Sequence, residues 1–337
     1  MSKLSNSIEK KLRRWAFNSP WLNKSCVWLD KRKSLNIPLL CKIYPNNIDL
    51  KNKLVTAQST LNSLFSDIRV RDDNDIPKKI WIYWAQGYDS APDIVKVAYH
   101  YWQTMNPDYD VCFLDEKKIQ SYFDFQSLFY NFSLDAGAAH KSDFIRVYLL
   151  SRYGGVWVDS TTFCWKPLDS WLQYETKGCG LFLFKQTQDR PDRQIKNWFM
   201  ASAKGNPVMV SLLHALAAYN FKPRQQTLSI TRFKEYQDCP GISHEGTGLE
   251  LLNALEEQGR FPYFYFHYLF NEVVKSGDAL ACWSIAKHTR NEHTNAGSEI
   301  GDALVSKQNY KTKYRQSDEY RERVALLEKI TASQRDG

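Results

Sequence analysis

Three charged side chains within a short stretch of the chain carry groups that can bind hydroxyls, phosphates or metal ions. Asp143 and Arg146 are three residues apart, and Asp159 follows shortly after them. Side chains spaced three apart on a helix share one face. Carboxylates hold hydroxyl groups and divalent cations, whereas an arginine neutralises phosphate. Each feature also has a purely structural explanation, because such Asp–Arg pairs are common ion pairs and a lone aspartate can cap a helix or form a turn.

The sequence around these residues predicts a helix followed by a strand. The helix covers about 137–152, carries the Asp–Arg pair and stops at the glycines 154–155. The next segment, 156–158, is β-branched and aromatic, as is typical of a buried strand. Asp159 then follows the strand directly. Because ligands of open α/β sheets bind at the carboxyl ends of strands, we expect Asp159 to lie at a binding edge.

Strands and helices alternate through the central part of the chain. Pro77 precedes the run Ile80-Trp81-Ile82-Tyr83-Trp84, which predicts a buried strand, and Pro92 opens a predicted helix. The predicted elements are the strands 80–84, 111–114, 156–158 and 180–184 and the helices 92–106, 137–152, 207–219 and 246–258. This alternation predicts an α/β fold whose mostly parallel sheet is covered by helices on both faces.

The basic character of the chain, whose net charge is +8, lies at its two ends. Leu4, Ile8, Leu12 and Trp15 recur at helical spacing among lysines and arginines, which predicts a basic amphipathic helix within residues 1–33. Such a helix fits an anionic membrane surface, and it fits equally an arm packed on its own domain or on a partner. Nucleic acid is not an expected partner, because the middle of the chain is slightly acidic and no recognition motif appears.

Several features predict a cytoplasmic protein. No stretch approaches the roughly 20 apolar residues that cross a bilayer, and the N-terminus lacks the apolar core of a secretory signal. The seven cysteines are scattered without a CxxC pair, as is typical of a reducing compartment. If the basic helix binds lipid, the protein would lie peripherally on the inner face of the cytoplasmic membrane.

The ordered pattern KSDxxR followed by YGGVWVD resembles the bacterial capsular polysaccharide synthesis proteins and, more broadly, the glycosyltransferases with an Asp-x-Asp ("DXD") sugar-binding motif. The matching segments are 76–81, 83–87, 106–107, 141–146, 153–159 and 166–168. The resemblance implies a GT-A-like, Rossmann-related fold, with a mixed, mostly parallel sheet flanked by helices and with helical N- and C-terminal additions. We accordingly expect a basic helical region over 1–75, a catalytic domain over 76–306 and a charged helix or tail over 307–337.

The resemblance also implies roles for single residues in binding a nucleoside-diphosphate sugar. Trp84 would lie near the base, and Asp143 and Arg146 would hold the donor sugar. Asp159 would contact ribose or sugar hydroxyls and a divalent metal, and Gly155 would let the backbone approach the donor. The physical chemistry agrees, because a leaving diphosphate needs cationic or metal stabilisation and a flat aromatic ring can stack on a base.

The motif departs from Asp-x-Asp in one respect, since this chain has Asp159-Ser160-Thr161 and a hydroxyl replaces the second carboxylate. Capsular relatives include such Asp-x-Thr endings. We expect Mn²⁺ or Mg²⁺ to be held by Asp159, Thr161 and the late histidine His288, with His293 as second choice. Hard cations favour carboxylate oxygens, however, which weakens the expectation of metal dependence. A polar surface loop explains both histidines equally well.

Two further segments are candidates for the acceptor side. The turn Gly246-Thr247-Gly248 resembles a turn that lines acceptor sites in relatives, which makes Thr247 a candidate, although the start of a helix explains it equally well. The charged segment 189–193 is a second candidate, and a solvated charge cluster is the simpler interpretation of it.

These features together predict an enzyme that transfers a hexose or N-acetylhexosamine from a nucleotide sugar, expected to be UDP-linked, onto a bacterial surface polysaccharide such as capsule or O-antigen. The acceptor would be a glycan or a lipid-linked glycan. The resemblance implies retention of the anomeric configuration. Two alternatives remain open: a sugar-phosphate transferase, and a non-catalytic glycan-binding or scaffold subunit of a polysaccharide assembly complex. A glycoside hydrolase is disfavoured because no carboxylate pair marks one.

Overall fold

The computed structural model describes residues 40–41, 48–132, 137–186, 191–224, 228–231, 248–257, 260–286 and 303–335. The amphipathic helix predicted within residues 1–33 lies outside these ranges. The strands are β1 Leu40–Cys41, β2 Lys79–Tyr83, β3 Asp110–Leu114, β4 Gly155–Asp159, β5 Thr162–Cys164, β6 Leu181–Lys185, β7 Ile195–Ser202, β8 Leu228–Thr231, β9 Arg260–Pro262 and β10 Val305–Lys307. The α-helices are α3 Ile48–Phe65, α4 Asp93–Met105, α5 Phe125–Tyr130, α6 Ala138–Tyr153, α7 Leu172–Thr176, α8 Pro207–Phe221, α10 Leu249–Glu257, α11 Tyr265–Val273, α12 Gly277–Ile285, α13 Thr312–Arg315 and α14 Asp318–Ser333.

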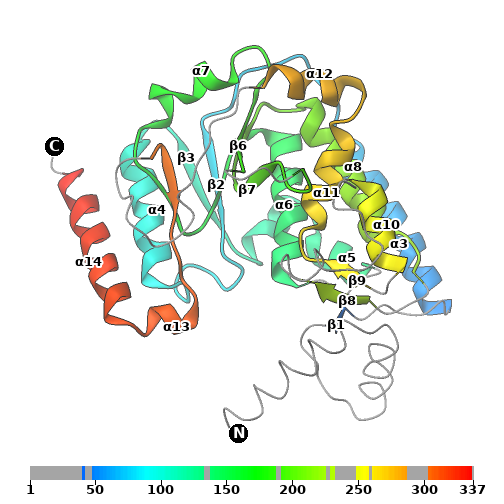
Figure 1. Cartoon of the computed structure of the whole chain (residues 1–337), viewed down its shortest axis with the longest axis horizontal. Coiled ribbons are helices and arrows are strands. Elements are labelled where there is room, and N and C mark those ends of the chain that lie inside the picture. Colours follow the sequence, from blue (N-terminus) through cyan, green and yellow to red (C-terminus); the bar gives the residue numbers. More distant parts are fainter. Residues whose placement is uncertain are drawn as a thin grey trace, which may run out of the picture.

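A central sheet of five strands in the order β3-β2-β4-β7-β6 divides the molecule into two layers. Strand β2 pairs in parallel with both β3 and β4, whereas β7 runs antiparallel to β4 and β6. Helices α6, α8, α11 and α3 lie on one side of the sheet, and α4 and α14 lie on the other (Figure 1). The predicted α/β class, with a mixed, mostly parallel sheet flanked by helices, is confirmed.

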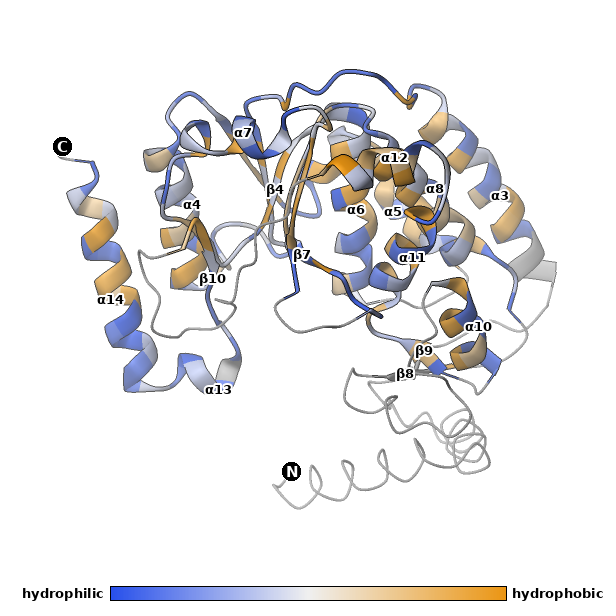
Figure 2. Ribbon diagram, turned by 45° about the horizontal axis from the view of Figure 1, so that its top comes forward, coloured by the Kyte–Doolittle hydropathy of each residue, from blue (hydrophilic) through white to orange (hydrophobic). Residues whose placement is uncertain are grey.

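Alternate residues of the central strands pack into opposite layers. Trp81 belongs to the apolar cluster that includes α6 and α8, whereas its neighbours Ile80 and Ile82 belong to the cluster that includes α4 and α14. Successive side chains of a strand point to opposite faces, so a sheet covered on both sides needs apolar residues at every position. The middle of the central strands is accordingly hydrophobic (Figure 2). Charged residues such as Lys79, Asp110 and Lys185 lie at the strand ends.

The junction between α6 and β4 depends on two glycines. Gly154 ends the helix with a positive φ of 69°, and Gly155 begins the strand at φ 99°. A Cβ on Gly155 would lie 2.5 Å from the carbonyl oxygen of Lys79 in the neighbouring strand. Only glycine combines this φ with this approach. The glycine pair therefore fixes how closely β4 pairs with β2.

The C-terminal part of the chain is built into the domain. Strand β10 pairs antiparallel with β5, and α14 packs along α4 (Figure 1). The predicted boundary between residues 306 and 307 falls within β10. The charged helix or tail predicted over 307–337 begins in β10 and then forms the two helices α13 and α14, and Ser317 caps α14 by accepting a hydrogen bond from the backbone of Tyr320 at 3.2 Å.

The sequence did not predict β7, the antiparallel strand that inserts between β4 and β6. It follows a charged loop, and most of its residues are buried without a polar alternation. Among the described residues, no helix has the length and apolar composition that spanning a bilayer requires.

Candidate active site

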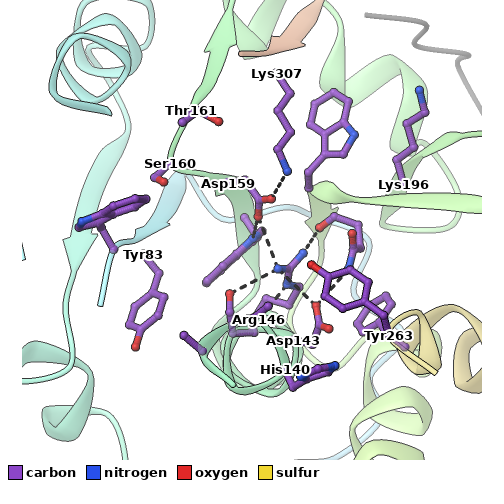
Figure 3. Close-up of a pocket in the computed structure, with 18 of the residues that line it drawn as sticks. Tyr83, His140, Asp143, Arg146, Asp159, Ser160, Thr161, Lys196, Tyr263 and Lys307 are labelled. Carbon is purple, nitrogen blue, oxygen red and sulfur yellow. Dashed lines mark hydrogen bonds and ion pairs between the residues drawn. The ribbon is translucent and has the colours of Figure 1, made fainter. Parts of the chain in front are cut away.

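A cavity of about 890 Å³ lies where the parallel strands β2 and β4 end. This volume is within the range of small-molecule sites. Its lining comes from the end of β2, the first turns of α6, the end of β4, strand β7, the segment before and into α11, and strand β10 with the residues after it. Segments from the middle and from the C-terminal end of the chain therefore share one wall (Figure 3).

Arg146 connects the two carboxylates of the site. Its guanidinium lies 3.3 Å from Asp143 Oδ1 and 3.5 Å from Asp159 Oδ1, and it also donates to the backbone carbonyl of Asn197 (Figure 3). The face of Trp157 lies beneath it, 5.1 Å from the guanidinium carbon. Helix α6 and strand β4 thus bring the three predicted residues together, as the i,i+3 spacing and the strand end required.

Asp159 has a second cationic partner from the far end of the sequence. Lys307 Nζ lies 2.5 Å from Asp159 Oδ2, and the indole nitrogen of Trp157 donates to Oδ1 at 3.2 Å. The register of β10 opposite β5, which pairs Lys307 with Thr162, sets this position. Every oxygen of the motif carboxylate is therefore engaged by a donor from the protein.

The two carboxylates differ in their protonation equilibria. Burial raises the pKa of Asp143 to about 7, against the opposing charge of Arg146 and with the negative charge of Asp159 adding to the rise. Burial acts in the same direction on Asp159, but Lys307 and Arg146 outweigh it and hold the pKa of Asp159 below its usual value. The carboxylate with two cations stays ionised, and the carboxylate with one is near its midpoint at neutral pH.

Positive groups outnumber negative groups in the lining. The cations are Arg146, Arg193, Lys196 and Lys307, and the carboxylates are Asp143 and Asp159. Arg193 also pairs with Asp192 at 3.7 Å and lies over the ring of Phe264. Such a surplus of cations in a recess attracts anionic ligands.

Aromatic rings form other parts of the wall. Trp84, at the end of β2, meets Tyr310 edge to face with ring centres 5.3 Å apart. The indole nitrogens of Trp84 and Trp198 are buried and have no hydrogen-bond partner among the described residues. A buried donor without a partner is costly, and an acceptor oxygen that reached either nitrogen would satisfy it.

Comparison with known proteins shows which protein family the chain belongs to. The profile described as "Capsular polysaccharide synthesis protein" matches residues 32–231, more than half of the chain. The chain belongs to this capsular polysaccharide synthesis family. The matched segment contains Asp143, Arg146, Asp159 and Lys196 and ends well before Lys307.

Individual relatives of this family member are named as glycosyltransferases. An O-glycosyltransferase braB of Annulohypoxylon truncatum is 30% identical over 39% of this chain and 34% of its own length. An initiation-specific alpha-1,6-mannosyltransferase of Candida albicans is 28% identical, over 61% and 56% respectively. Inositol phosphoceramide mannosyltransferase 1 of Schizosaccharomyces pombe is 24% identical, over 60% and 64%. The matches thus span about one third to two thirds of the length of these relatives.

A solved structure, that of a PaToxG glycosyltransferase, aligns with 73% of this chain and 92% of its own chain. The TM-score is 0.30 and the sequence identity is 15%. A similarity of this size carries no argument about fold or function.

The structure places the other predicted residues of this family member as follows. Trp84 and Thr161 line the cavity, with Thr161 almost fully buried. Gly155 is not part of the lining: it lies at the opposite end of β4, against the backbone of Lys79. Its conformation is explained by strand pairing. The candidates His288, His293 and Thr247, and the first part of the charged segment 189–193, lie outside the described residues.

Several lining residues were not predicted from the sequence. Two are His140 and His267, whose pKa values burial lowers to about 4 and about 3, so that both rings are neutral near pH 7. His140 is three residues before Asp143 on the same helix face, which the spacing could have revealed. Lys196 and Lys307 belong to β7 and β10, and no local pattern marks either lysine as facing a site.

The described residues do not fit a divalent metal well. Mg²⁺ and related hard cations need several oxygen ligands, which one or two carboxylates, waters and substrate phosphates supply. No group of three or more aspartate, glutamate, histidine or cysteine side chains that could hold a metal occurs within the described ranges. Asp159, the motif carboxylate, is instead held between Lys307 and Arg146.

Proposed function

We propose that this protein is a glycosyltransferase that moves a hexose or N-acetylhexosamine from a nucleotide sugar to a glycan hydroxyl. The observation that carries the proposal is the buried Asp143–Arg146–Asp159 cluster at the carboxyl edge of the sheet, in a cavity with a surplus of cations. Carboxylates can grip sugar hydroxyls, and the surrounding cations can bind a diphosphate. The names of the curated relatives support the same class of reaction.

The proposed roles follow from position. Trp84, with Tyr310 beside it, offers a flat wall for the base at the end of β2. Asp143 and Asp159 would accept hydrogen bonds from hydroxyls of the donor. Arg146 orients both carboxylates, because it contacts each of them. Thr161 lies at the edge of the same recess.

The reaction proposed is transfer with retention. The acceptor hydroxyl attacks the anomeric carbon on the face from which the diphosphate departs, and the bond between that carbon and the phosphate oxygen breaks. The hydroxyl proton passes to the departing phosphate oxygen. Cations fixed around the recess stabilise the charge that develops on this oxygen without reorganising during the step.

The acceptor proposed is a bacterial surface polysaccharide, such as capsule or O-antigen, or its lipid-linked precursor. The donor proposed is UDP-linked. The Candida albicans and Schizosaccharomyces pombe relatives described above are named as mannosyltransferases, so mannose is among the hexoses to be tested first. Contact of residues 1–33 with an anionic membrane would bring the enzyme to the surface that carries a lipid-linked acceptor.

A thermal-shift screen against UDP-, GDP-, CMP- and dTDP-sugars tests the donor site. We expect one nucleotide class to raise the melting temperature of the wild type, because a ligand at 100 times its dissociation constant stabilises by about 2.7 kcal/mol. Asp159→Ala should lose this shift. The matched control is Asp169→Ala, since Asp169 also pairs with a lysine, Lys78, but lies away from the cavity.

Mass spectrometry of the products then separates the alternatives. A glycan that gains one sugar, together with free nucleoside diphosphate, supports the proposal. A product that retains a phosphate would identify a sugar-phosphate transferase instead. Glycan binding without consumption of any donor would favour the scaffold subunit.

A further inference from the structure

We propose that Lys307 binds the donor diphosphate in the place of a divalent metal, so that donor binding by this chain is independent of Mn²⁺ and Mg²⁺. The inference rests on the function proposed above. It is carried by the partners of the motif carboxylate, by the ligands present around it, by the way the strand fixes Lys307, and by the charges in the lining.

Both oxygens of Asp159, the carboxylate that would bind a metal, already have partners. Asp159 already holds the ammonium of Lys307 at 2.5 Å on Oδ2, and Trp157 and Arg146 contact Oδ1. A divalent ion bound to this carboxylate would lie within a few ångströms of one or both of these cations. Charges of the same sign at that distance repel strongly in a partly buried site. The lysine and a metal therefore compete for the same position.

The other oxygen atoms that could bind a metal beside Asp159 are a hydroxyl and a carboxylate that already has partners. The second carboxylate of an Asp-x-Asp motif is here Thr161. The other carboxylate in the lining, Asp143, is engaged through Oδ1 by Asn197 at 3.0 Å and by Arg146. Neutral hydroxyl oxygens are weaker ligands for Mn²⁺ and Mg²⁺ than carboxylates. Within the described residues, no three aspartate, glutamate, histidine or cysteine side chains come together to hold a cation, so most ligands of a hard cation at Asp159 would have to be waters or phosphate oxygens.

The fold holds Lys307 firmly in its place. Its strand, β10, pairs residue by residue with β5, and the backbone of Gln308 donates to the carbonyl of Thr161 at 2.9 Å. The indole of Trp165 donates to Ser306 Oγ at 2.6 Å. An ammonium group has three donor hydrogens, so Lys307 can keep Asp159 and still donate to phosphate oxygens. A charge placed in advance in this way binds a diphosphate at little cost of reorganisation.

The lining of the cavity contains more cationic side chains than carboxylates. Four cationic side chains face two carboxylates, and the neutral histidines His140 and His267 add no charge at pH 7. The recess therefore carries a positive surplus before any metal is added. A lysine acts toward phosphate as a compact point charge, which is also what a divalent ion supplies to a leaving diphosphate.

Isothermal titration of the purified chain with UDP and with GDP, each in EDTA and in MnCl₂, tests the inference. We expect the affinity for the preferred nucleotide to agree within about twofold between the two conditions. Lys307→Ala should weaken binding about ten- to hundredfold in both, the range expected for a hydrogen bond to a charged group. Lys307→Arg should restore most of the affinity, because it keeps the charge.

Lys78→Ala is the matched control, because Lys78 also pairs with an aspartate and lies outside the cavity. It should bind the nucleotide as the wild type does. A melting temperature of Lys307→Ala close to that of the wild type would confirm that the loss of affinity does not come from unfolding.

The outcomes separate the two proposals. Binding that disappears in EDTA, or that MnCl₂ strengthens tenfold or more, would overturn the metal-independent site and leave the glycosyltransferase proposal intact. Wild-type affinity in Lys307→Ala would also overturn it. If no nucleotide binds in either condition, both proposals fall together.

Discussion

Both edges of the parallel strands carry an ion pair between an aspartate and a cation, but the two pairs lie in different surroundings. At the amino edge, Lys78 pairs with Asp169 at 2.7 Å, and 47% and 43% of the two side chains are exposed. At the carboxyl edge, Arg146 pairs with Asp143 at 3.3 Å, and only 6% and 10% of the side chains are exposed. Both are ion pairs of ordinary length. They differ in the cation, lysine or arginine, and above all in how much of each side chain is exposed.

This difference shows where the protein maintains an unfavourable arrangement. Exposed pairs contribute little to stability because water competes for both partners. Buried charges lose their hydration, and the pairing only partly compensates for that loss. The carboxyl edge keeps Arg146 and Asp143 out of water beside a cavity, with Asp159 and Lys307 only partly exposed, which is typical of a ligand site. The amino edge carries the glycines and exposed pairs that serve packing.

The largest effect is expected from Arg146→Met. The substitution leaves Asp143 buried without its cation, and breaking a buried pair by removing one partner costs about 3–5 kcal/mol. Urea denaturation measures the change in the free energy of unfolding. Lys78→Met, at the amino edge, should leave that free energy nearly unchanged because its pair is exposed. Equal effects at the two edges would contradict the comparison.

A smaller loss is expected from Gly155→Ala, which tests whether this glycine serves the fold. Its positive φ and the 2.5 Å approach to the Lys79 carbonyl should cost about 2–3 kcal/mol. Gly137→Ala is the control, because a Cβ there meets nothing within 4 Å. Differential scanning calorimetry compares the two. If Gly155→Ala left stability unchanged but weakened donor binding, the predicted role of Gly155 in the donor site would be supported instead.

The pH dependence of stability should differ between the edges. The pKa of Asp143 is raised to about 7, so its contribution is fully present below the unfolded value near 3.8 and is lost as the pH rises through about 7. In that window the wild type should lose up to about 1.4 kcal/mol per pH unit relative to Asp143→Asn. Denaturation at several pH values measures this difference. Parallel profiles of the two proteins would show that the carboxyl of Asp143 does not titrate there.

Asp110 provides the opposite case at the amino edge. Its pKa is lowered, chiefly by the hydrogen bond from Lys79, so its contribution is present above the unfolded value and is lost as the pH falls through the folded value. Asp110→Asn should therefore change the stability profile only at acidic pH, and with the opposite slope.

The smallest loss of stability is expected from Lys307→Ala. Asp159 keeps Arg146 as a partner, and the side chains of Asp159 and Lys307 are both partly exposed. We expect the free energy of unfolding to fall by about 1 kcal/mol. Guanidinium denaturation without ligand measures it. A loss of several kcal/mol would show that Lys307 mainly stabilises the carboxyl edge of the sheet and would speak against its role in place of a metal ion.

The sequence was sufficient for the parts of the site that lie close together along the chain. Helix α6 and strand β4 follow from helical spacing, the two glycines and an aromatic β-branched run, and the structure brings Asp143, Arg146 and Asp159 together on these two elements. The alternation of strands and helices also predicted the class of fold. These features are local, because hydrogen bonding and side-chain periodicity operate over a few residues.

Tertiary structure alone decided the rest of the cavity. Lys307 lies 148 residues from its partner Asp159, on a strand of three residues that is too short to show any periodicity. Strand β7, which carries Lys196, inserts antiparallel between β4 and β6, a pairing that no local pattern specifies. Pairing between distant strands depends on how the whole chain buries its apolar faces. The sequence by itself therefore determined the acidic motif and its helix–strand frame, and only packing across the chain decided which cations meet it.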